Sequence, residues 1–480
     1  MDYIEKELEH KKYLINFYRS RDIGNKKLLT TDHGTWMIFS DEEYRHFTEE
    51  NMDETLYNEA EQRGLLITSS NYGSIINQYH RRYESIEKGA ALHIIVPTIR
   101  CNLRCSYCHS EAASITDGNY YDMKEDTLKR TLEFIFQSPN HTITIEFQGG
   151  EPLLNKPLIK KTCEYAAVLN QKYRKKYKIA LISNFIAMDE DFLQFIYENK
   201  DVIHLCTSLD GPEYVHDQNR KYVHRDVGTY KQVTYWIKRC FEKGIKVGML
   251  MVTTRQSLPY WKEIIDEYVR WGQTEIQIKP LDYLGYAVEV WDTIGYTMEE
   301  FIDFWKKCVD YTFELLGKGV YIAERYVVLA FKKILTNKNV DFLDLTNPCG
   351  AIRGQVVYNY NGDIYCCDEA RVMDDFIIGN VFEDNYNGLI QKRKSKEIIM
   401  ASIAEGYYCD SCVYKPFCGV CPVLGYAQQR SYNIKLNKTN RCKKNRTVFD
   451  YVFNKIIYEQ ASVKQFIMGY MLQSRLDRQS

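Results

Sequence analysis

The stretch Leu92-His-Ile-Ile-Val-Pro-Thr-Ile-Arg-Cys101-Asn-Leu-Arg-Cys105-Ser-Tyr-Cys108 decides the fold, because it joins an apolar run to three closely spaced cysteines. The apolar run predicts a buried strand over 92–98, which places the cysteines on the loop that leaves this strand. Three thiolates this close can bind three irons of one iron–sulfur cubane, and no fourth cysteine follows at the short ferredoxin spacing. One iron would then be free for another ligand. A zinc loop, or free thiols in a core, is the alternative interpretation.

Short β-rich runs alternate with longer amphipathic segments between residues 92 and 281. The expected strands are 92–98, 142–148, 178–184, 202–210, 246–254 and 275–281, and the expected helices include 123–137, 158–176 and 229–243. Six βα units in series predict an α/β fold, a parallel sheet curled into a partial (β/α)6 TIM-like barrel. Active sites of such sheets form at the C-terminal ends of the strands, so the cysteine loop is expected at the barrel mouth.

Two further regions flank the barrel, which we expect over 86–340. Residues 1–85 form a separate module: Leu28-Leu-Thr-Thr and Trp36-Met-Ile-Phe predict a hairpin around Asp32-His-Gly34, followed by helices at 41–49 and 54–63 and a strand at 65–68. Residues 341–446 contain eight cysteines in a turn-rich stretch, a composition that indicates stabilisation by metals. Residues 447–480 predict a helical tail.

The composition excludes several classes of protein. The chain has 480 residues and a net charge of −1, so no basic field indicates a nucleic-acid partner. The first twelve residues form a charged helical pattern and not a signal peptide, and no apolar run reaches membrane-spanning length. The 15 cysteines, clustered in part, favour metal binding in a reducing cytoplasm over disulfides. Cys163, Cys206, Cys240 and Cys308 stand singly and are predicted to be core residues.

Polar motifs follow three more of the expected strands. Gln148-Gly149-Gly150-Glu151-Pro152 ends the second; its glycines allow close backbone approach, and its carboxylate can accept from an ammonium group. Ser183-Asn184 ends the third strand. Asp210-Gly-Pro212 follows the fourth, with His216-Asp217-Gln-Asn-Arg220 shortly after. A plain turn, with Asp210 and Asp217 as ordering residues, is the alternative for this last string.

Together these strings resemble the radical S-adenosylmethionine (radical SAM) superfamily. The resemblance implies that Cys101, Cys105 and Cys108 hold a SAM-binding [4Fe–4S] cluster, with Tyr107 as the aromatic residue before the last cysteine. By the same resemblance the remaining cofactor contacts would be Gly149, Gly150 and Glu151 to the methionyl amine of SAM, Ser183 and Asn184 to its ribose, and Arg220 to its carboxylate.

The later cysteines allow two interpretations. From the residues alone, Cys409-x2-Cys412 and Cys418-x2-Cys421 are typical of a structural zinc site, which leaves the other cysteines of this stretch without partners. The full spacing resembles the SPASM extension, which carries two auxiliary [4Fe–4S] clusters. That resemblance assigns Cys409, Cys412, Cys418 and Cys442 to one cluster and Cys349, Cys367 and Cys421 to the other. The second set has no clear fourth cysteine. Cys366 is left unassigned, because two adjacent side chains rarely bind the same cubane.

Over most of its length the chain is similar to the B-type radical SAM maturases of the His-Xaa-Ser peptide system. The strings that carry this are Leu92 to Cys101, Ile145-Glu-Phe-Gln-Gly-Gly-Glu-Pro-Leu-Leu154 and Val357-Tyr-Asn-Tyr-Asn-Gly-Asp-Ile-Tyr365. The resemblance implies a 5′-deoxyadenosyl radical that modifies, and in our expectation cross-links, a ribosomally made precursor peptide. Residues 1–85 resemble winged-helix peptide-recognition modules, and the electron donor would be a flavodoxin or ferredoxin. The alternatives are a sulfatase-maturing-type protein oxidase and a non-catalytic zinc or iron–sulfur protein.

Overall fold

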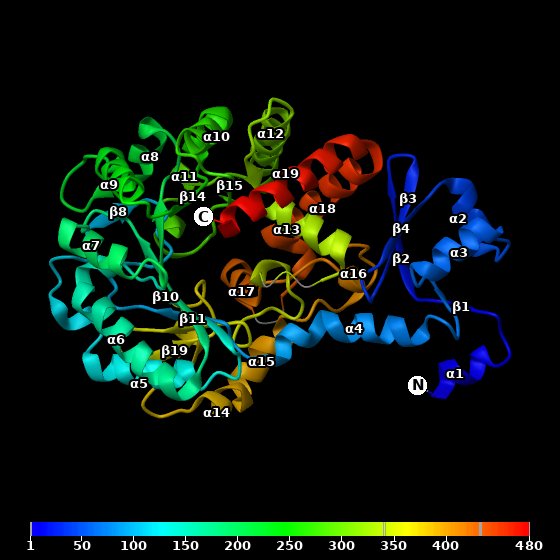
Figure 1. The fold of residues 1–480 in the computed structure, drawn as a ribbon, viewed down its shortest axis with the longest axis horizontal. Coiled ribbons are helices and arrows are strands. Elements are labelled where there is room, and N and C mark those ends of the chain that lie inside the picture. Colours follow the sequence, from blue (N-terminus) through cyan, green and yellow to red (C-terminus); the bar gives the residue numbers. More distant parts are fainter. Residues whose placement is uncertain (1, 339, 341, 432–433, 480) are drawn as a thin grey trace.

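The central element is a nine-stranded sheet of order β16-β14-β12-β11-β10-β6-β18-β19-β20 (Figure 1). The structure is a computed structural model that describes residues 2–338, 340, 342–431 and 434–479; residue 341, where the cysteine-rich segment was expected to begin, lies outside them. Six strands run parallel in chain order: β6 (Leu92–Ile95), β10 (Thr142–Phe147), β11 (Lys176–Ser183), β12 (Ile203–Ser208), β14 (Val247–Val252) and β16 (Ile278–Lys279). The α/β fold with its series of six parallel strands is thus confirmed. The last expected strand is split, with β15 (Glu275–Ile276) pairing elsewhere with β17 (Ala323–Glu324).

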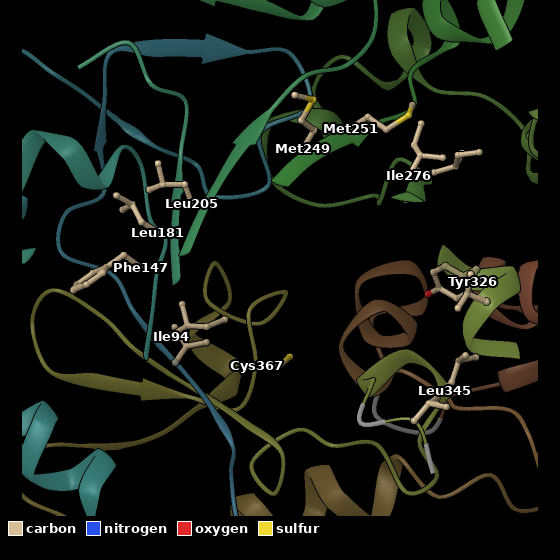
Figure 2. Close-up of a cluster of buried hydrophobic side chains, with 14 of the residues drawn as sticks. Ile94, Phe147, Leu181, Leu205, Met249, Met251, Ile276, Tyr326, Leu345 and Cys367 are labelled. Atoms are coloured by element: carbon tan, nitrogen blue, oxygen red, sulfur yellow. The ribbon is translucent and has the colours of Figure 1, made fainter. Parts of the chain in front are cut away.

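The two faces of the parallel sheet differ in burial. Helices α5 (Glu125–Phe136), α6 (Lys156–Tyr173), α7 (Glu190–Glu198) and α9 (Tyr230–Glu242) lie outside the strands (Figure 1). Figure 2 shows Phe147, Leu181 and Leu205, from three neighbouring strands and on one face of the sheet, among the side chains buried in the core. The residues that alternate with them are only partly buried, among them Glu146 on β10 and Cys206 on β12. This second face is therefore the open inner surface of the partial barrel.

Three strands of the cysteine-rich region extend the same sheet. Strand β18 (Gln355–Tyr358) runs parallel to β6, with Val357 opposite Ile94. Strands β19 (Asp363–Tyr365) and β20 (Ile377–Asn380) continue antiparallel. No strand was expected here, since a short apolar run inside a turn-rich segment gives little periodicity. The domain limits stay a prediction, but the sheet itself contains strands from both sides of residue 340.

The N-terminal residues form a three-stranded antiparallel sheet with two helices. The hairpin of β3 (Lys26–Thr31) and β4 (Trp36–Phe39) and the helices α2 (Asp41–Thr48) and α3 (Glu54–Gln62) were predicted. Strand β2 (Tyr18–Ile23) was missed because its sequence, Tyr-Arg-Ser-Arg-Asp-Ile, is mostly polar. Strand β5 (Leu66–Ile67) pairs with β1 (Leu14–Ile15) and does not join the hairpin sheet. The long helix α4 (Tyr72–Glu87) leads from this region to the barrel (Figure 1).

Two consecutive helices end the chain, as predicted, although the first begins earlier than residue 447. These are α18 (Asn440–Tyr458), whose N-cap Thr439 accepts a hydrogen bond from the Cys442 amide, and α19 (Gln460–Gln479). Helix α18 packs against the N-terminal sheet: Trp36 contacts Phe453 edge-to-face, and Arg21 pairs with Asp450 at 3.0 Å. Within the described residues, none of the helices combines the length and apolar character that a membrane crossing needs.

Candidate active site at the mouth of the barrel

The three cysteines of the first motif lie at the end of β6, where the barrel opens. Cys101 is in β7 (Arg100–Cys101), Cys105 ends β8 (Leu103–Cys105) and Cys108 follows in a turn. Burial, then the neighbouring Cys105, raises the pKa of the Cys101 thiol well above its usual range; burial raises the pKa of Cys105 to about 12. Thiols in such surroundings ionise when a metal supplies positive charge, so the donor set fits an iron–sulfur cluster. Among the described residues, no three His, Cys, Asp or Glu side chains are arranged so that they could hold a single metal ion.

Arg220 connects the cysteine loop to the fourth strand. It lies in β13 (Arg220–Tyr222), directly opposite Cys105 of β8, and its Nη1 is 3.7 Å from the Cys105 Sγ. Its Nε is 3.3 Å from the carboxylate of Asp210, which is fully buried and also accepts hydrogen bonds of 2.7 and 2.8 Å from the Tyr107 hydroxyl. Burial raises the pKa of Asp210, and Arg220 and Tyr107 counteract that rise. Asp210 therefore has a definite role, as the buried anion that orients both Arg220 and Tyr107.

Glu151 lies next to the cysteine loop and is held there by residues at the end of β11. Its carboxylate accepts hydrogen bonds from the Ser183 hydroxyl at 2.7 Å and from the backbone amides of Asn184 and Leu153 at 2.8 and 2.9 Å. The side chain is 1% exposed, and burial raises its pKa. A nearby cation stabilises the charged form of such a buried carboxylate. An ammonium group could therefore bind here.

The two glycines before Glu151 allow it to lie this close. A Cβ on Gly150 would be 2.1 Å from the Arg100 carbonyl oxygen, and one on Gly149 would be 2.4 Å from that of Thr98. The amides of Gly150 and Glu151 donate to these same two carbonyl groups. In this structure the close approach is therefore to the cysteine loop itself, which the glycines hold in place.

Asn184 completes the ring of polar residues. Its Nδ2 donates to the Asn102 side chain at 2.8 Å and lies 3.8 Å from the Cys101 Sγ. Ser183 reaches the site indirectly, because its hydroxyl is engaged by Glu151. The structure thus brings together all the predicted cofactor-contact residues, from the ends of four strands, around Cys101 and Cys105.

Four of the later cysteines line one cavity. Cys409, Cys412, Cys418 and Cys442 are among the residues around a space of about 250 Å³ next to α18. Burial raises the pKa of Cys409 to about 11 and that of Cys418 to about 12. The neighbouring Cys412 and Cys442 add to the rise of both pKa values. The resemblance to the SPASM extension assigned these four thiols to one auxiliary cluster, and a cavity bordered by four thiols fits such a group.

The other cysteines come together at the inner end of the same region. Burial raises the pKa of Cys349 to about 12 and that of Cys421 well above its usual range, and Cys349 and Glu369 contribute to the rise at Cys421. The pKa of Cys367 is raised first by its contact with Cys366, whose Sγ is 3.9 Å from its own, then by burial, with smaller contributions from Glu369 and Cys421. Cys349, Cys367 and Cys421 are therefore neighbours, with Cys366 and the Glu369 carboxylate beside them.

A polar link between the two cysteine regions was not foreseen from the sequence. Arg371 contacts His109 at 3.2 Å, hydrogen-bonds Ser110 and lies 3.3 Å from Asp368, which in turn is 3.4 Å from His109. His109 and Ser110 follow Cys108 directly, and Asp368 follows Cys367. The only signal in the sequence is this adjacency to cysteines, because the partners are 261 residues apart.

Glu146 on the inner face of the barrel was also missed. Burial raises its pKa to about 7, and its carboxylate accepts a 2.6 Å hydrogen bond from Gln148. Of the four single cysteines, Cys240 and Cys308 are buried as predicted, whereas Cys163 and Cys206 are only partly buried. The prediction of a core position for Cys206 is wrong because its place on β12 alternates with that of buried Leu205 and Thr207, so that it faces the barrel interior.

Comparison with known families identifies the barrel. Residues 95–268 match the family model of the Radical SAM superfamily. This segment is a radical SAM domain, and the superfamily uses a [4Fe–4S] cluster and S-adenosylmethionine. The predicted cofactor class is thereby confirmed.

Whole-chain similarities are more distant. The cysteine-type anaerobic sulfatase-maturating enzyme of Clostridium perfringens is 24% identical over 373 residues, which span 76% of this chain and 96% of that protein. The structure of anSMEcpe with bound AdoMet superposes with a TM-score of 0.67 at 22% identity, covering 78% of this chain and 98% of that one. Streptococcus suis SuiB bound to precursor peptide SuiA gives a TM-score of 0.55 at 14% identity, covering 89% and 99%. The two superpositions show a shared fold.

Proposed function

We propose that this chain, with its radical SAM domain at 95–268, is an enzyme that modifies a ribosomally made precursor peptide by a radical reaction and cross-links it. The observation that carries the proposal is the convergence of Glu151, Asn184 and Arg220 on the loop of Cys101, Cys105 and Cys108. A metal-binding protein without catalysis needs none of these three polar residues, whereas an amino-acid-bearing cofactor needs all of them.

The protein residues in this proposal bind, orient and exclude water. When bound, the cluster and S-adenosylmethionine supply an adenosyl radical able to abstract hydrogen from the peptide. With the cofactor bound, Glu151 would accept from its ammonium group, and Arg220, held by Asp210 and Tyr107, would offer its guanidinium to the carboxylate. Asn184 would contact the ribose. The open inner face of the sheet, with Glu146, borders the space in which the peptide lies.

A peptide substrate is supported by two lines of evidence. A precursor peptide is bound in the SuiB structure, whose fold this chain shares. The N-terminal sheet and helices make a compact module of their own, with a small core of residues such as Leu29, Phe39 and Phe47. We assign this module to binding of the peptide, and within this class we assign the chain to the B-type maturases of the His-Xaa-Ser system.

A sulfatase-maturing-type oxidase is the second candidate function, favoured by the similarity to the Clostridium perfringens enzyme. The two functions differ in the product. A cross-linked peptide loses hydrogen atoms and keeps its sulfur, whereas oxidation of a cysteine-type sulfatase peptide to an aldehyde removes sulfur. Mass spectrometry of the peptide after reaction therefore separates them.

The decisive experiment is cleavage of S-adenosylmethionine by the anaerobically reconstituted protein. We expect 5′-deoxyadenosine and methionine from the native chain and none from Cys101→Ala. Cys240→Ala, a buried cysteine on α9, is the matched control and should retain cleavage. Cleavage by Cys101→Ala would refute the assignment.

We further propose two auxiliary [4Fe–4S] clusters, held by Cys409, Cys412, Cys418 and Cys442 and by Cys349, Cys367 and Cys421. With the first cluster they predict about twelve irons per chain, against about four if only the first exists. Replacing Cys412 and, separately, Cys349 by alanine should each lower the count by about four irons. Iron and sulfide analysis measures this directly.

A further inference from the structure

The cavity of Cys409, Cys412, Cys418 and Cys442 continues to the protein surface. A second hollow, of about 410 Å³, lies between α16 (Tyr407–Asp410) and the turn at Leu436–Lys438, and Cys409 borders both spaces. All four of these cysteines are partly exposed, whereas in the other set Cys349 and Cys367 are buried and Cys421 alone is partly exposed. Of the two later cysteine sets, this one is therefore nearer to solvent, and Cys409 is its outermost point of access.

Basic side chains border this outer hollow and the cysteine cavity next to it. The exposed Lys435 and Lys438 border the hollow and the exposed Arg446 borders the cavity; among the residues that the structure describes, none of the three has an ion-pair partner. Glu405 is the acidic residue that borders the hollow, and Asp410 nearby is paired with Lys415 at 2.6 Å. The chain as a whole has a net charge of −1, so the positive field is local to this face.

An aromatic side chain stands at the same place. Tyr408 borders both hollows and is 63% exposed. Exposed aromatic residues surrounded by a polar rim are typical of protein interfaces, where they contribute contact area at small entropic cost. The face therefore combines basic side chains with an exposed aromatic anchor, as a docking site does.

We propose that the face formed by Tyr408, Cys409, Lys435, Lys438 and Arg446, here called the Cys409 face, docks an acidic one-electron carrier protein. This inference rests on the proposed auxiliary cluster and adds the place at which electrons cross the surface. In the transfer the carrier loses one electron and is oxidised, and the cluster gains that electron; no bond forms or breaks. The opposite direction, discharge of an electron after the radical step, uses the same face. The basic rim steers the acidic partner, so the association is expected to weaken as salt screens the charges.

The test uses the reconstituted full chain and a purified acidic flavodoxin, fully reduced, as the probe. Stopped-flow absorbance follows cluster bleaching at low ionic strength and at about 0.5 M salt. We expect K435E/K438E to lower the second-order rate by about tenfold or more at low salt, with a smaller effect at high salt. The matched control is K238E/K306E, which reverses two exposed lysines on α9 and on α12 (Met298–Gly317) and should stay within about twofold of the native rate. Reduction by dithionite, which needs no docking, should be unchanged in both variants.

Three outcomes overturn the proposal. Equal flavodoxin rates for K435E/K438E and the native chain place docking elsewhere. Loss of precursor-peptide binding in K435E/K438E, with flavodoxin reduction intact, makes the face a peptide site. Unchanged iron in Cys409→Ala removes the electron acceptor. SAM cleavage by the first cluster, measured on the same samples with dithionite, tells this last failure apart from failure of the radical SAM assignment.

Discussion

At the scale of single residues, Asp210 is the side chain on which the geometry of the candidate active site depends. It is fully buried, and its charge is balanced by Arg220 and by the Tyr107 hydroxyl. Removing one member of such a buried pair leaves an uncompensated charge, which costs far more than a surface pair contributes. The residue that positions Arg220 beside Cys105 is thus also a determinant of stability.

The first prediction follows from this pair. Arg220→Ala should lower the free energy of unfolding of the cluster-free protein by about 3–5 kcal/mol, measured by urea titration. Arg239→Ala, which removes an exposed pair with Glu190, is the control and should leave stability unchanged. R220A/D210N should recover part of the loss, since it removes both charges. A loss below about 1 kcal/mol for Arg220→Ala would mean that Asp210 is neutral in the native protein.

The second prediction concerns Gly150. An added Cβ would meet the Arg100 carbonyl oxygen, so Gly150→Ala should displace the cysteine loop and cost about 1–3 kcal/mol of stability. S-adenosylmethionine binding, measured by calorimetry on reconstituted protein, should be lost or strongly weakened. Gly73→Ala is the control, because nothing lies within 4 Å of the position that its new methyl group would take. Normal cofactor binding by Gly150→Ala would contradict the role given to this glycine.

At the scale of elements, the strand β6 joins the barrel to the cysteine-rich region. It pairs with β10 on one side and β18 on the other, and His93 in its centre is fully buried. His93 Nε2 lies 3.0 Å from the Ala90 carbonyl oxygen, which can only accept, so Nε2 carries the proton. Nδ1 then accepts from the Tyr358 hydroxyl on β18 at 3.0 Å. This hydrogen bond ties the two regions together while His93 is neutral.

The third prediction is a pH dependence of stability that originates in His93. Burial lowers its pKa to about 3 in the folded protein, from about 6.5 in the unfolded chain. The unfolded state therefore binds a proton as the pH falls below about 6.5 and the folded state does not, so stability decreases. Between about pH 8 and pH 5 this contribution amounts to about 2 kcal/mol.

Urea titrations at several pH values measure this effect. In His93→Gln the His93 share of the slope should disappear, although the variant is less stable throughout. The same replacement at the exposed His141 should leave the native slope unchanged. A native slope in His93→Gln would assign the pH dependence to other groups.

At the scale of the whole molecule, the N-terminal region is joined to the cysteine-rich region and the tail. Ile23 and Leu28 belong to the main hydrophobic core, and the Thr30 hydroxyl donates to the Val413 carbonyl at 2.7 Å, next to Cys412. Trp36 Nε1 donates to the Ile334 carbonyl on α13 (Arg325–Thr336) at 3.0 Å. Ser20 and Arg21 of this region also border the cavity of Cys409, Cys412, Cys418 and Cys442, so the N-terminal region and the cysteine-rich region are packed together.

The fourth prediction tests this joining. Deletion of residues 1–85 should expose the core around Phe453 and yield a protein that aggregates or unfolds at a markedly lower temperature, followed by circular dichroism and size-exclusion chromatography. Deletion of residues 1–8, which contain only the peripheral helix α1 (Asp2–Leu8), is the control and should be neutral. A shortened chain with a native melting temperature would show that the module is energetically independent.

The sequence by itself determined the features that depend on neighbours along the chain. Alternating apolar residues gave the parallel strands, and the spacing of Cys101, Cys105 and Cys108 keeps their thiols within reach of one another in any compact loop. The glycines before Glu151 and the hairpin around Gly34 were readable for the same reason. The inner set of Cys349, Cys367 and Cys421, in contrast, was assigned by resemblance, because nothing local brings such distant residues together.

Only the tertiary structure decided how the distant parts meet. Cross-strand pairing placed Arg220 opposite Cys105, the pairing of β11 with β10 brought Ser183 to Glu151, and the addition of β18 to β6 brought Arg371 to His109. It also set the cavity of Cys409 at the surface and Cys349 in the core. The physical reason is that these contacts follow from strand order and side-chain packing over hundreds of residues, for which no local pattern in the chain contains the information.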